Sequence, residues 1–419
     1  MGVVVLGQTD VREPVPIDEV ALPEIMQTPE HRADPHPFYH RLRREAPVCL
    51  VPEFDELVLT RYADCEAVLR DPRFSSDPEH RRLELPYEQQ DVRTQLGGSE
   101  LNILLFIDPP DHTRIRRLVS KAFTPRAVER MRGHIQDIVD GILDDAADKG
   151  ELDVVAELGY LVPVRVICEM MDVPRDDVHL FRDWSAAATR LLDGIIPPDE
   201  LAKAVGGALQ LINYLNGLIE ERRRKPGDDL LSGLIAAEEA GETLSEPELR
   251  SITLLLFVAG HETTLNLIGN GTYALLRHPT ELARLREDPS LVPSTVEECL
   301  RWDGPVHITG RIATEDLEVH DFRVEKGQQL LVLLAAANRD PARFPDPDRF
   351  DVGRPDNQHL TFSHGMHYCL GAALARAEGQ IALGTLVRRF GDLRLLTEKP
   401  SYRDHFVLRG LDELRVAVG

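Results

Sequence analysis

The chain has 419 residues, of which 48 are Lys or Arg and 71 are Asp or Glu, so its formal net charge is −23. Such a charge argues against a protein that wraps nucleic acid or adheres to anionic lipid, because both tasks need Lys and Arg. Hydrophobic residues make up 42% of the chain, which is enough for a large packed core and argues against disorder.

The cysteines indicate a reducing, cytoplasmic setting. Their number is odd, and no pair has the close spacing of a metal site or suggests a disulfide framework. The apolar run at residues 3–6 has no basic residues before it, so we expect no signal peptide. The longest apolar run, residues 330–337, is too short to span a bilayer, and we expect no membrane contact. The five cysteines are Cys49, Cys65, Cys168, Cys299 and Cys369.

In chain order, residues 1–34 are predicted to be irregular and residues 35–419 to form a single domain. Residues 48–60 have the pattern of a β-hairpin. Residues 112–300 are mostly helical in pattern, and short strands return near 316–335 and 405–418. The fold class is therefore mostly α with small β-sheets. Helix breaks are expected at Pro125, Pro163, Pro174, Pro197, Pro198 and Pro226.

Two helices have predicted starting points. Ser245 and Glu248 form a capping box that opens a helix of about 32 residues, which Pro279 ends. Residues 254–259 in this helix are apolar on every face, so we expect it to be buried all round. Ser294 and Glu297 form the second predicted capping box.

The long helix becomes polar abruptly at residues 260–264. A carboxylate and two hydroxyls in a core helix cost free energy unless they are hydrogen-bonded. Gly260 also removes side-chain bulk, at a cost of about 1 kcal/mol relative to Ala. The stretch is either a kinked core helix or a notch for proton delivery or ligand binding. Further along, Glu298 and Arg301 can pair at i, i+3, and such a pair alone is usually a surface salt bridge.

A glycine-bearing loop, residues 362–371, holds Cys369 just before a strongly helix-forming run. A helix amino terminus favours the thiolate. Three uses are open: an inert buried thiol, a nucleophile with His367 as its base, or a thiolate metal ligand.

Together these segments resemble the cytochrome P-450 family of haem-thiolate monooxygenases, in its soluble bacterial form, over residues 35–419. Residues 362–371 are similar to its haem-binding loop, 298–301 to its Glu-x-x-Arg motif and 259–264 to its oxygen-activation helix. Residues 108–116 resemble the start of the helix on the cysteine side of the haem, and 338–347 resemble the meander. Ser363 and Asp172 depart from the family, which usually has glycine at both positions.

The resemblance implies a single-domain cytochrome P-450 fold with haem b (iron protoporphyrin IX) between the long central helix and the helix after the cysteine loop. Cys369 would be the axial ligand of the iron. Glu298, Arg301 and Arg354 would form a structural network that supports the loop. Further haem contacts are implied at the propionates for His112, Arg116, Arg311 and His367, and elsewhere for Phe362, Gly371, Ala259 and Gly260.

The implied activity is insertion of one oxygen atom from O2 into a medium-sized hydrophobic substrate, such as a macrolide, terpenoid or steroid-like secondary metabolite. Glu262 would relay protons, and Thr263 would hold dioxygen and ordered water. The alternatives are oxidative coupling, desaturation, peroxide use, a haem sensor without turnover and a Cys–His hydrolase.

The lid is expected at residues 75–106 and 184–205. The expected pocket residues are Leu255, Val258, Val306, His307, Thr309, Val407 and Leu408.

Residues 112–132 contain seven basic side chains and one acidic one, Glu129. This segment is either an ordinary charged helix face or a docking site for an acidic redox partner. The resemblance implies a ferredoxin and an NAD(P)H-dependent ferredoxin reductase, since no reductase domain follows residue 419, and we expect a monomer. The predicted docking residues are Arg114, Arg117, Lys121 and Arg376.

Overall fold

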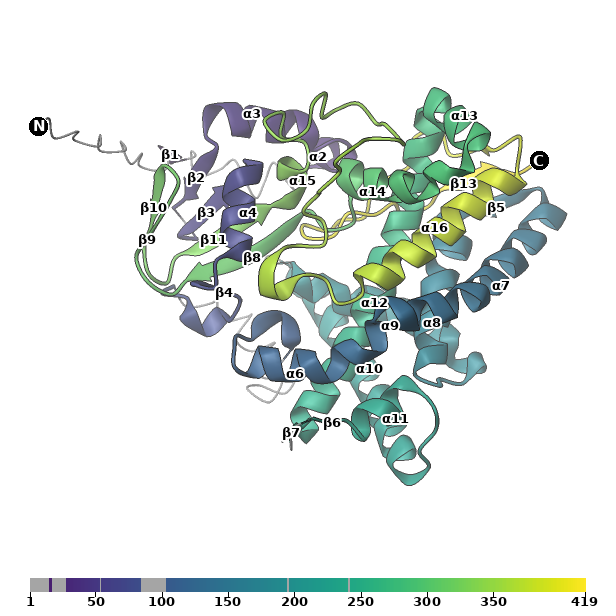
Figure 1. Ribbon diagram of the computed structural model, residues 1–419, viewed down its shortest axis with the longest axis horizontal. Helices are drawn as coiled ribbons and strands as arrows, with labels where there is room; N and C mark the ends of the chain where they lie inside the picture. The colour runs from purple at the N-terminus through teal and green to yellow at the C-terminus, as the bar shows by residue number, and fades with distance from the viewer. Residues whose placement is uncertain (1–14, 17–27, 53, 84–102, 194–195, 240–241) are drawn as a thin grey trace, which may run out of the picture.

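The computed structural model describes residues 15–16, 28–52, 54–83, 103–193, 196–239 and 242–419 (Figure 1). A sheet-containing region lies beside a larger helical region, and helices make up most of the described chain. The predicted fold class, mostly α with small β-sheets, is therefore confirmed.

The largest sheet has six strands in the order β1-β2-β3-β11-β8-β4. The predicted hairpin is present, because β2 and β3 pair antiparallel with Val48 opposite Leu59. Strand β11 then pairs parallel with β3 and antiparallel with β8, which fixes Arg311 inside the sheet. The strand bounds are β1 Val15–Pro16, β2 Val48–Val51, β3 Glu56–Leu59, β4 Phe74–Ser75, β8 Ile308–Ala313 and β11 Gln329–Leu333.

The remaining strands form small sheets. Of the strands predicted in 405–418, only β13 is present among the described residues, and an isolated bridge joins Val306 to Leu408. Strand β9 Leu317–Val319 pairs with β10 Phe322–Val324, and β6 Glu238–Glu239 pairs with β7 Glu242–Thr243. In a three-stranded sheet, β13 Arg415–Ala417 lies between β5 Glu151–Asp153 and β12 Arg394–Leu395.

The helices begin or end close to the prolines that were predicted to break them, with one exception. Pro163, predicted as a break, lies inside α8, which continues directly from the helical turn of residues 154–159. Residues 1–34, predicted to be irregular, contain β1 and α2. The bounds are α2 Pro29–Ala33, α3 His36–Glu45, α4 Tyr62–Arg70, α6 Asp111–Val119, α7 Pro125–Lys149, α8 Tyr160–Met170, α9 Phe181–Thr189, α10 Pro198–Arg224, α11 Leu230–Ile235, α12 Glu246–Arg277, α13 Pro279–Glu287, α14 Val292–Asp303, α15 Leu334–Ala337 and α16 Ala372–Arg389.

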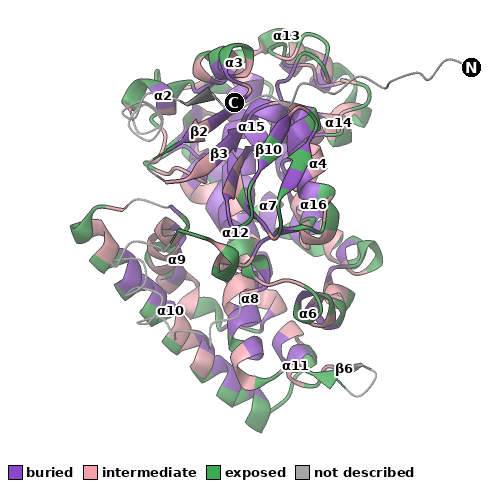
Figure 2. Ribbon diagram, turned by 90° about the vertical axis from the view of Figure 1, so that its left-hand side faces the viewer, coloured by how far each residue is buried: buried purple, intermediate pink, exposed green. Residues whose placement is uncertain are grey.

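Helix α12 is the core helix. It begins at the predicted capping box of Ser245 and Glu248, and it packs against α8, α10, α14 and α16. By length and composition it could cross a membrane, but 67% of its most apolar window is buried inside the protein. Figure 2 shows the surrounding centre of the molecule as buried. Its apolar character is therefore explained by packing within the protein.

The second predicted capping box is wrong. Helix α14 begins at Val292, so Ser294 lies within the helix, and the Ser294 hydroxyl lies 2.6 Å from the Val352 carbonyl oxygen. Pro293 at the start of the helix explains the difference, because its ring already has a helical φ. Glu297 instead binds Arg376.

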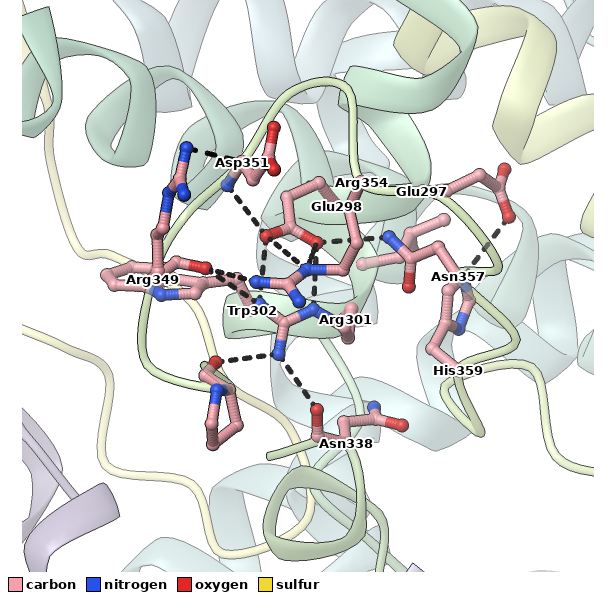
Figure 3. A network of polar contacts seen from close by, with 12 residues as sticks. Glu297, Glu298, Arg301, Trp302, Asn338, Arg349, Asp351, Arg354, Asn357 and His359 are labelled. Atoms are coloured by element: carbon pink, nitrogen blue, oxygen red, sulfur yellow. Dashed lines mark hydrogen bonds and ion pairs between the residues drawn. The ribbon is translucent and has the colours of Figure 1, made fainter. Parts of the chain in front are cut away.

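Glu298 and Arg301 form a fully buried ion pair, with both Nε–Oε2 and Nη2–Oε1 at 2.8 Å (Figure 3). The surface-bridge interpretation is thus wrong for this pair. Glu298 also accepts hydrogen bonds from Arg354 Nε (3.2 Å), Asn357 Nδ2 (3.0 Å) and the N–H of Asp351 (2.8 Å). Arg301 donates to the carbonyls of Asn338, Pro347 and Arg349.

The network predicts a large cost for removing one charge. Arg301→Met leaves the Glu298 carboxylate buried without its main partner, and we expect the free energy of unfolding to fall by about 3–5 kcal/mol. The matched control is Arg250→Met, which breaks an exposed i, i+4 pair with Glu246 and should cost less than about 1 kcal/mol. Urea unfolding measures both, and equal losses would contradict the structural role of the buried pair.

Candidate active site

The loop before α16, residues 362–371, has its two ends joined by a hydrogen bond and packs against α4. The N–H of Cys369 donates to the Phe362 carbonyl at 2.8 Å. Gly365 has φ +67°, and a Cβ there would lie 2.4 Å from the carbonyl oxygen of Leu69. Only glycine fits this contact. The Arg376 guanidinium covers the buried Phe362 ring, 4.5 Å from its centroid.

Both departures from the family pattern occur at left-handed backbone positions. Ser363 has φ +61° and a buried hydroxyl without a partner among the described residues. Asp172 has φ +54° in an exposed turn after α8, where Asp is one of the tolerated residues. Its carboxylate pairs with Arg222 at 2.8 Å. The backbone thus keeps a conformation that favours glycine at both positions.

Cys369 differs from the other cysteines. It alone among the five is exposed, and it lies three residues before α16. Partial removal of water by the surrounding protein raises the pKa of its thiol, whereas the N–H of Gly371 and the charge of Arg116 lower it. A Cβ at Gly371 would meet no atom within 4 Å. The backbone therefore leaves one open side beside an accessible sulfur.

Cationic and imidazole side chains gather next to this loop. In Figure 1 the loop lies between β8 and α6, and the contacts agree: Arg116 of α6 donates to the Tyr368 carbonyl. The His112 and His367 rings lie 4.3 Å apart between centroids. Burial and the charge of Arg311 lower the pKa of His367 to about 3.

These groups form no ion pairs with carboxylates among the described residues. Nε2 of His112 and Nε2 of His367 are buried without a hydrogen-bond partner in the described part of the chain. Arg311 is 5% exposed, bonds to its neighbours Thr309 and Gly310, and forms no ion pair with any described carboxylate. Burial lowers its pKa to about 10. A group with two carboxylates and a metal for the thiolate fits this donor set, and haem b has both features.

One stripe of the core helix is not buried. Leu255, Val258 and Thr263 are half-buried and Ala259 is exposed, although the helix runs through the core. The Thr263 hydroxyl donates to the Ala259 carbonyl at 3.2 Å. These residues follow the i, i+4 spacing of one helix face. The face is therefore available to a bound group.

Glu262 lies in different surroundings and is 3% exposed. Its Oε2 accepts a hydrogen bond from Arg403 at 3.2 Å, and its Oε1 lies 3.3 Å from the Ser185 hydroxyl. Ser185 also contacts His261. No local sequence pattern marks Ser185 or Arg403 as partners of Glu262, because they are 77 and 141 residues distant from it.

Gly260 has a packing function that the sequence analysis did not predict. A Cβ at this position would lie 3.2 Å from Cγ1 of Ile167 in α8. Glycine thus allows α12 to approach α8. Ile167 occupies the space that a side chain at Gly260 would take, so the missing side chain serves helix packing. Contact of Gly260 with haem stays a prediction.

The predicted pocket residues divide into two groups. Val306, Thr309 and Val407 are half-buried, as are Leu255 and Val258. Leu408 is buried and bridged to Val306. His307 is also buried, and its ring lies near Tyr39 and Asp303, with Nε2 3.8 Å from Oδ1 of Asp303. The pocket assignment of His307 is corrected, because its ring belongs to a cluster of the fold.

The predicted lid is partly described. Residues 84–102 of the first segment and 194–195 of the second lie outside the described residues. The rest of the second segment belongs to α9, a short 3-10 turn and the start of α10.

The predicted docking residues are not equivalent. Arg114 pairs with Glu248 and Asp111 and so joins α6 to the start of α12. Arg376 binds Glu297 at 2.7 Å. These internal ion pairs oppose the docking prediction for both arginines. Arg117 and Lys121 are exposed, and Arg117 pairs with the exposed Glu242.

A buried carboxyl was also missed. Glu378 of α16 is fully buried, and neither of its oxygens has a hydrogen-bond partner among the described residues. Burial raises its pKa to about 8, and the nearby Thr264 hydroxyl opposes this shift only partly. Its position in a helix rich in Ala and Gly gave no sequence signal.

Comparisons with known proteins agree with this geometry. The family model described as Cytochrome P450 matches residues 57–408. The vitamin D(3) 25-hydroxylase of Pseudonocardia autotrophica is 41% identical, over 92% of this chain and 94% of that protein. The 6-deoxyerythronolide B hydroxylase of Saccharopolyspora erythraea is 40% identical, over 90% and 94%.

A solved structure matches over nearly its whole length. The myxobacterial cytochrome P450 CYP267B1 in complex with myristic acid is 40% identical, with a TM-score of 0.85 over 95% of this chain and 100% of that one. Since the family model and the relatives cover most of the chain, this protein belongs to the cytochrome P450 family of monooxygenases, whose cofactor is haem and whose oxidant is O2.

Proposed function

We propose that this protein inserts one oxygen atom from O2 into a medium-sized, neutral hydrophobic molecule, by hydroxylation or epoxidation. The observation that carries the proposal is the accessible Cys369 beside buried imidazoles and a guanidinium that have no anionic partner among the described residues. The unburied face of α12 supports it. A cytoplasmic location fits the accessible thiol.

Haem b, when bound, supplies the oxygen activation, which thiolate ligation promotes. Cys369 would ligate its iron. His112, Arg116, Arg311 and His367 would hold the propionates, since their donors lie beside the loop. Phe362, Gly371 and Ala259 would border the ring.

Two side chains of α12 would handle protons. Glu262 would release a proton at Oε1 or Oε2 after its hydrogen bonds to Ser185 and Arg403 rearrange. The Thr263 hydroxyl would turn from the Ala259 carbonyl and donate toward the oxygen substrate. A Cys–His hydrolase is not favoured, because His367 makes no hydrogen bond to the Cys369 sulfur in the described structure.

Replacing the ligand tests the assignment directly. We expect the reduced, CO-bound protein to show the red-shifted Soret band of thiolate ligation, and Cys369→His to lose it. Cys168→Ala removes a buried thiol of α8 and should retain the band. A wild-type protein that binds no haem, or a Cys369→His variant with an unchanged band, would refute the proposal.

The described pocket residues predict a neutral substrate. Leu255, Val258, Val306 and Val407 are apolar, Thr309 adds a hydroxyl, and none of these five side chains is a cation that could pair with a carboxylate. Vitamin D3, 6-deoxyerythronolide B and myristic acid test this preference through the haem spin-state shift. We expect at least one of the two neutral compounds to bind about ten-fold more tightly than myristic acid. Tightest binding of myristic acid would contradict a neutral substrate.

We also propose that a ferredoxin, reduced by an NAD(P)H-dependent reductase, docks at the exposed start of the basic segment. Arg117→Glu and Lys121→Glu should slow ferredoxin-supported haem reduction several-fold, and more so at low salt, because steering by charge is screened. Reduction by dithionite provides the control and should not change. Equal ferredoxin-supported rates in wild type and both variants would refute this docking site.

A further inference from the structure

Ser185 is a buried hydroxyl between two titratable groups of the core helix. Its Oγ lies 2.8 Å from Nε2 of His261 and 3.3 Å from Oε1 of Glu262. All three side chains are buried, and Ser185 belongs to α9 whereas the other two belong to α12. We propose that His261 and Ser185 form a proton relay that supplies Glu262. The inference rests on the proposed function of Glu262 as a proton donor.

The hydrogen-bond partners of His261 and Ser185 support the relay. Nδ1 of His261 lies 2.8 Å from the Phe257 carbonyl oxygen, which can only accept, so Nδ1 carries a proton. Nε2 therefore accepts from Ser185 when the ring is neutral and donates to Ser185 when the ring is charged. At 2.8 Å one proton must lie between these two atoms. The Phe181 carbonyl, 2.6 Å from Oγ, competes for the Ser185 proton in the charged state.

The proposed step moves protons only. The Nε2 proton passes to Oγ of Ser185 while the original Oγ proton passes to Oε1 of Glu262. His261 becomes neutral, Glu262 becomes a carboxylic acid, and Ser185 is unchanged. No electron moves. Once Glu262 has passed this proton on, a proton from solvent must return to Nε2 of His261 before the next transfer.

The surrounding charges act in opposite directions on the two ends. Burial lowers the pKa of His261 and favours release of its proton, while the adjacent Glu262 raises that pKa and Arg403 lowers it. Arg403 also forms an ion pair with Glu262, with Nη1 3.2 Å from Oε2. From α8, Tyr160 lies with its ring 6.1 Å from the His261 ring, and Arg182 of α9 stacks on Tyr160.

Two variants separate proton transfer from positioning. His261→Gln retains an N–H that can donate to Ser185, but an amide cannot release a proton. Ser185→Ala removes the bridging hydroxyl. Thr189→Ala is the matched control, because it removes another buried hydroxyl of α9, whose partner among the described residues is the Ala186 carbonyl. Glu262→Gln tests the proposed function on which the relay rests.

The readout is the fate of O2 in the holoenzyme reduced by a ferredoxin and its reductase, without a substrate. Peroxide formation takes up two electrons and two protons for each O2, and water formation takes up four of each. We expect His261→Gln and Ser185→Ala to lower the ratio of water to peroxide about ten-fold, and Thr189→Ala to leave it unchanged. Reduced CO spectra and thermal unfolding check that each variant is folded and loaded.

The outcomes are distinct. A wild-type ratio in Glu262→Gln would overturn the proposed function of Glu262. A low ratio in Glu262→Gln together with wild-type ratios in His261→Gln and Ser185→Ala would overturn the relay alone. A low ratio in Ser185→Ala with a wild-type ratio in His261→Gln would show that Ser185 only positions Glu262.

A second measurement does not depend on turnover. Nitrogen-15 NMR of His261 in the reduced, CO-bound protein reports whether Nε2 carries a proton. We expect Glu262→Gln and Ser185→Ala to shift this signal and its pH midpoint, and Thr189→Ala to leave both unchanged. Identical Nε2 signals in wild type, Glu262→Gln and Ser185→Ala would overturn the relay.

Discussion

The ion pair of Glu298 and Arg301 sets the position of the cysteine loop. Both charges are fully buried, so every donor and acceptor of the pair must be satisfied by nearby groups. Those groups are backbone carbonyls and N–H groups between residues 338 and 351, together with Arg354 and Asn357. This segment leads directly into the loop that carries Cys369. The pair thus specifies a chain path, which matters more for the site than its net contribution to stability.

The buried charged side chains form two kinds of site, which differ in whether a described side chain of opposite charge pairs with them. Glu298 has Arg301, Asp303 has Arg409 and Glu262 has Arg403, so these buried anions meet cations within the chain. The groups around Cys369 show the reverse pattern, since His112, His367 and Arg311 form no ion pair with a described carboxylate. A ligand that brings carboxylates to these donors binds the folded chain alone and therefore stabilises it. Cofactor binding and folding are expected to be coupled through these three residues.

Patterns of neighbouring residues were enough to predict several helices and strands. Features that depend on residues distant in the sequence could not be predicted in this way. The capping box at Ser245 and the hairpin at Val48 depend on neighbouring residues, so the sequence was sufficient for both. Burial of Glu298 depends on a segment some fifty residues away, so its pattern alone resembled a surface pair. The contact of Gly260 with Ile167 and the ring contacts of His307 likewise depend on tertiary packing. Motif order identified the family where single motifs could not.

The geometry of α12 explains why its acid and alcohol need further groups. Consecutive residues of a helix point in directions about 100° apart, so Glu262 and Thr263 cannot share one face. Thr263 lies on the unburied face with Ala259, whereas Glu262 lies among Ser185, His261 and Arg403. A proton accepted on the buried side must therefore be carried around the helix. Movement of the Glu262 carboxyl away from Arg403 is the step that can connect the two faces.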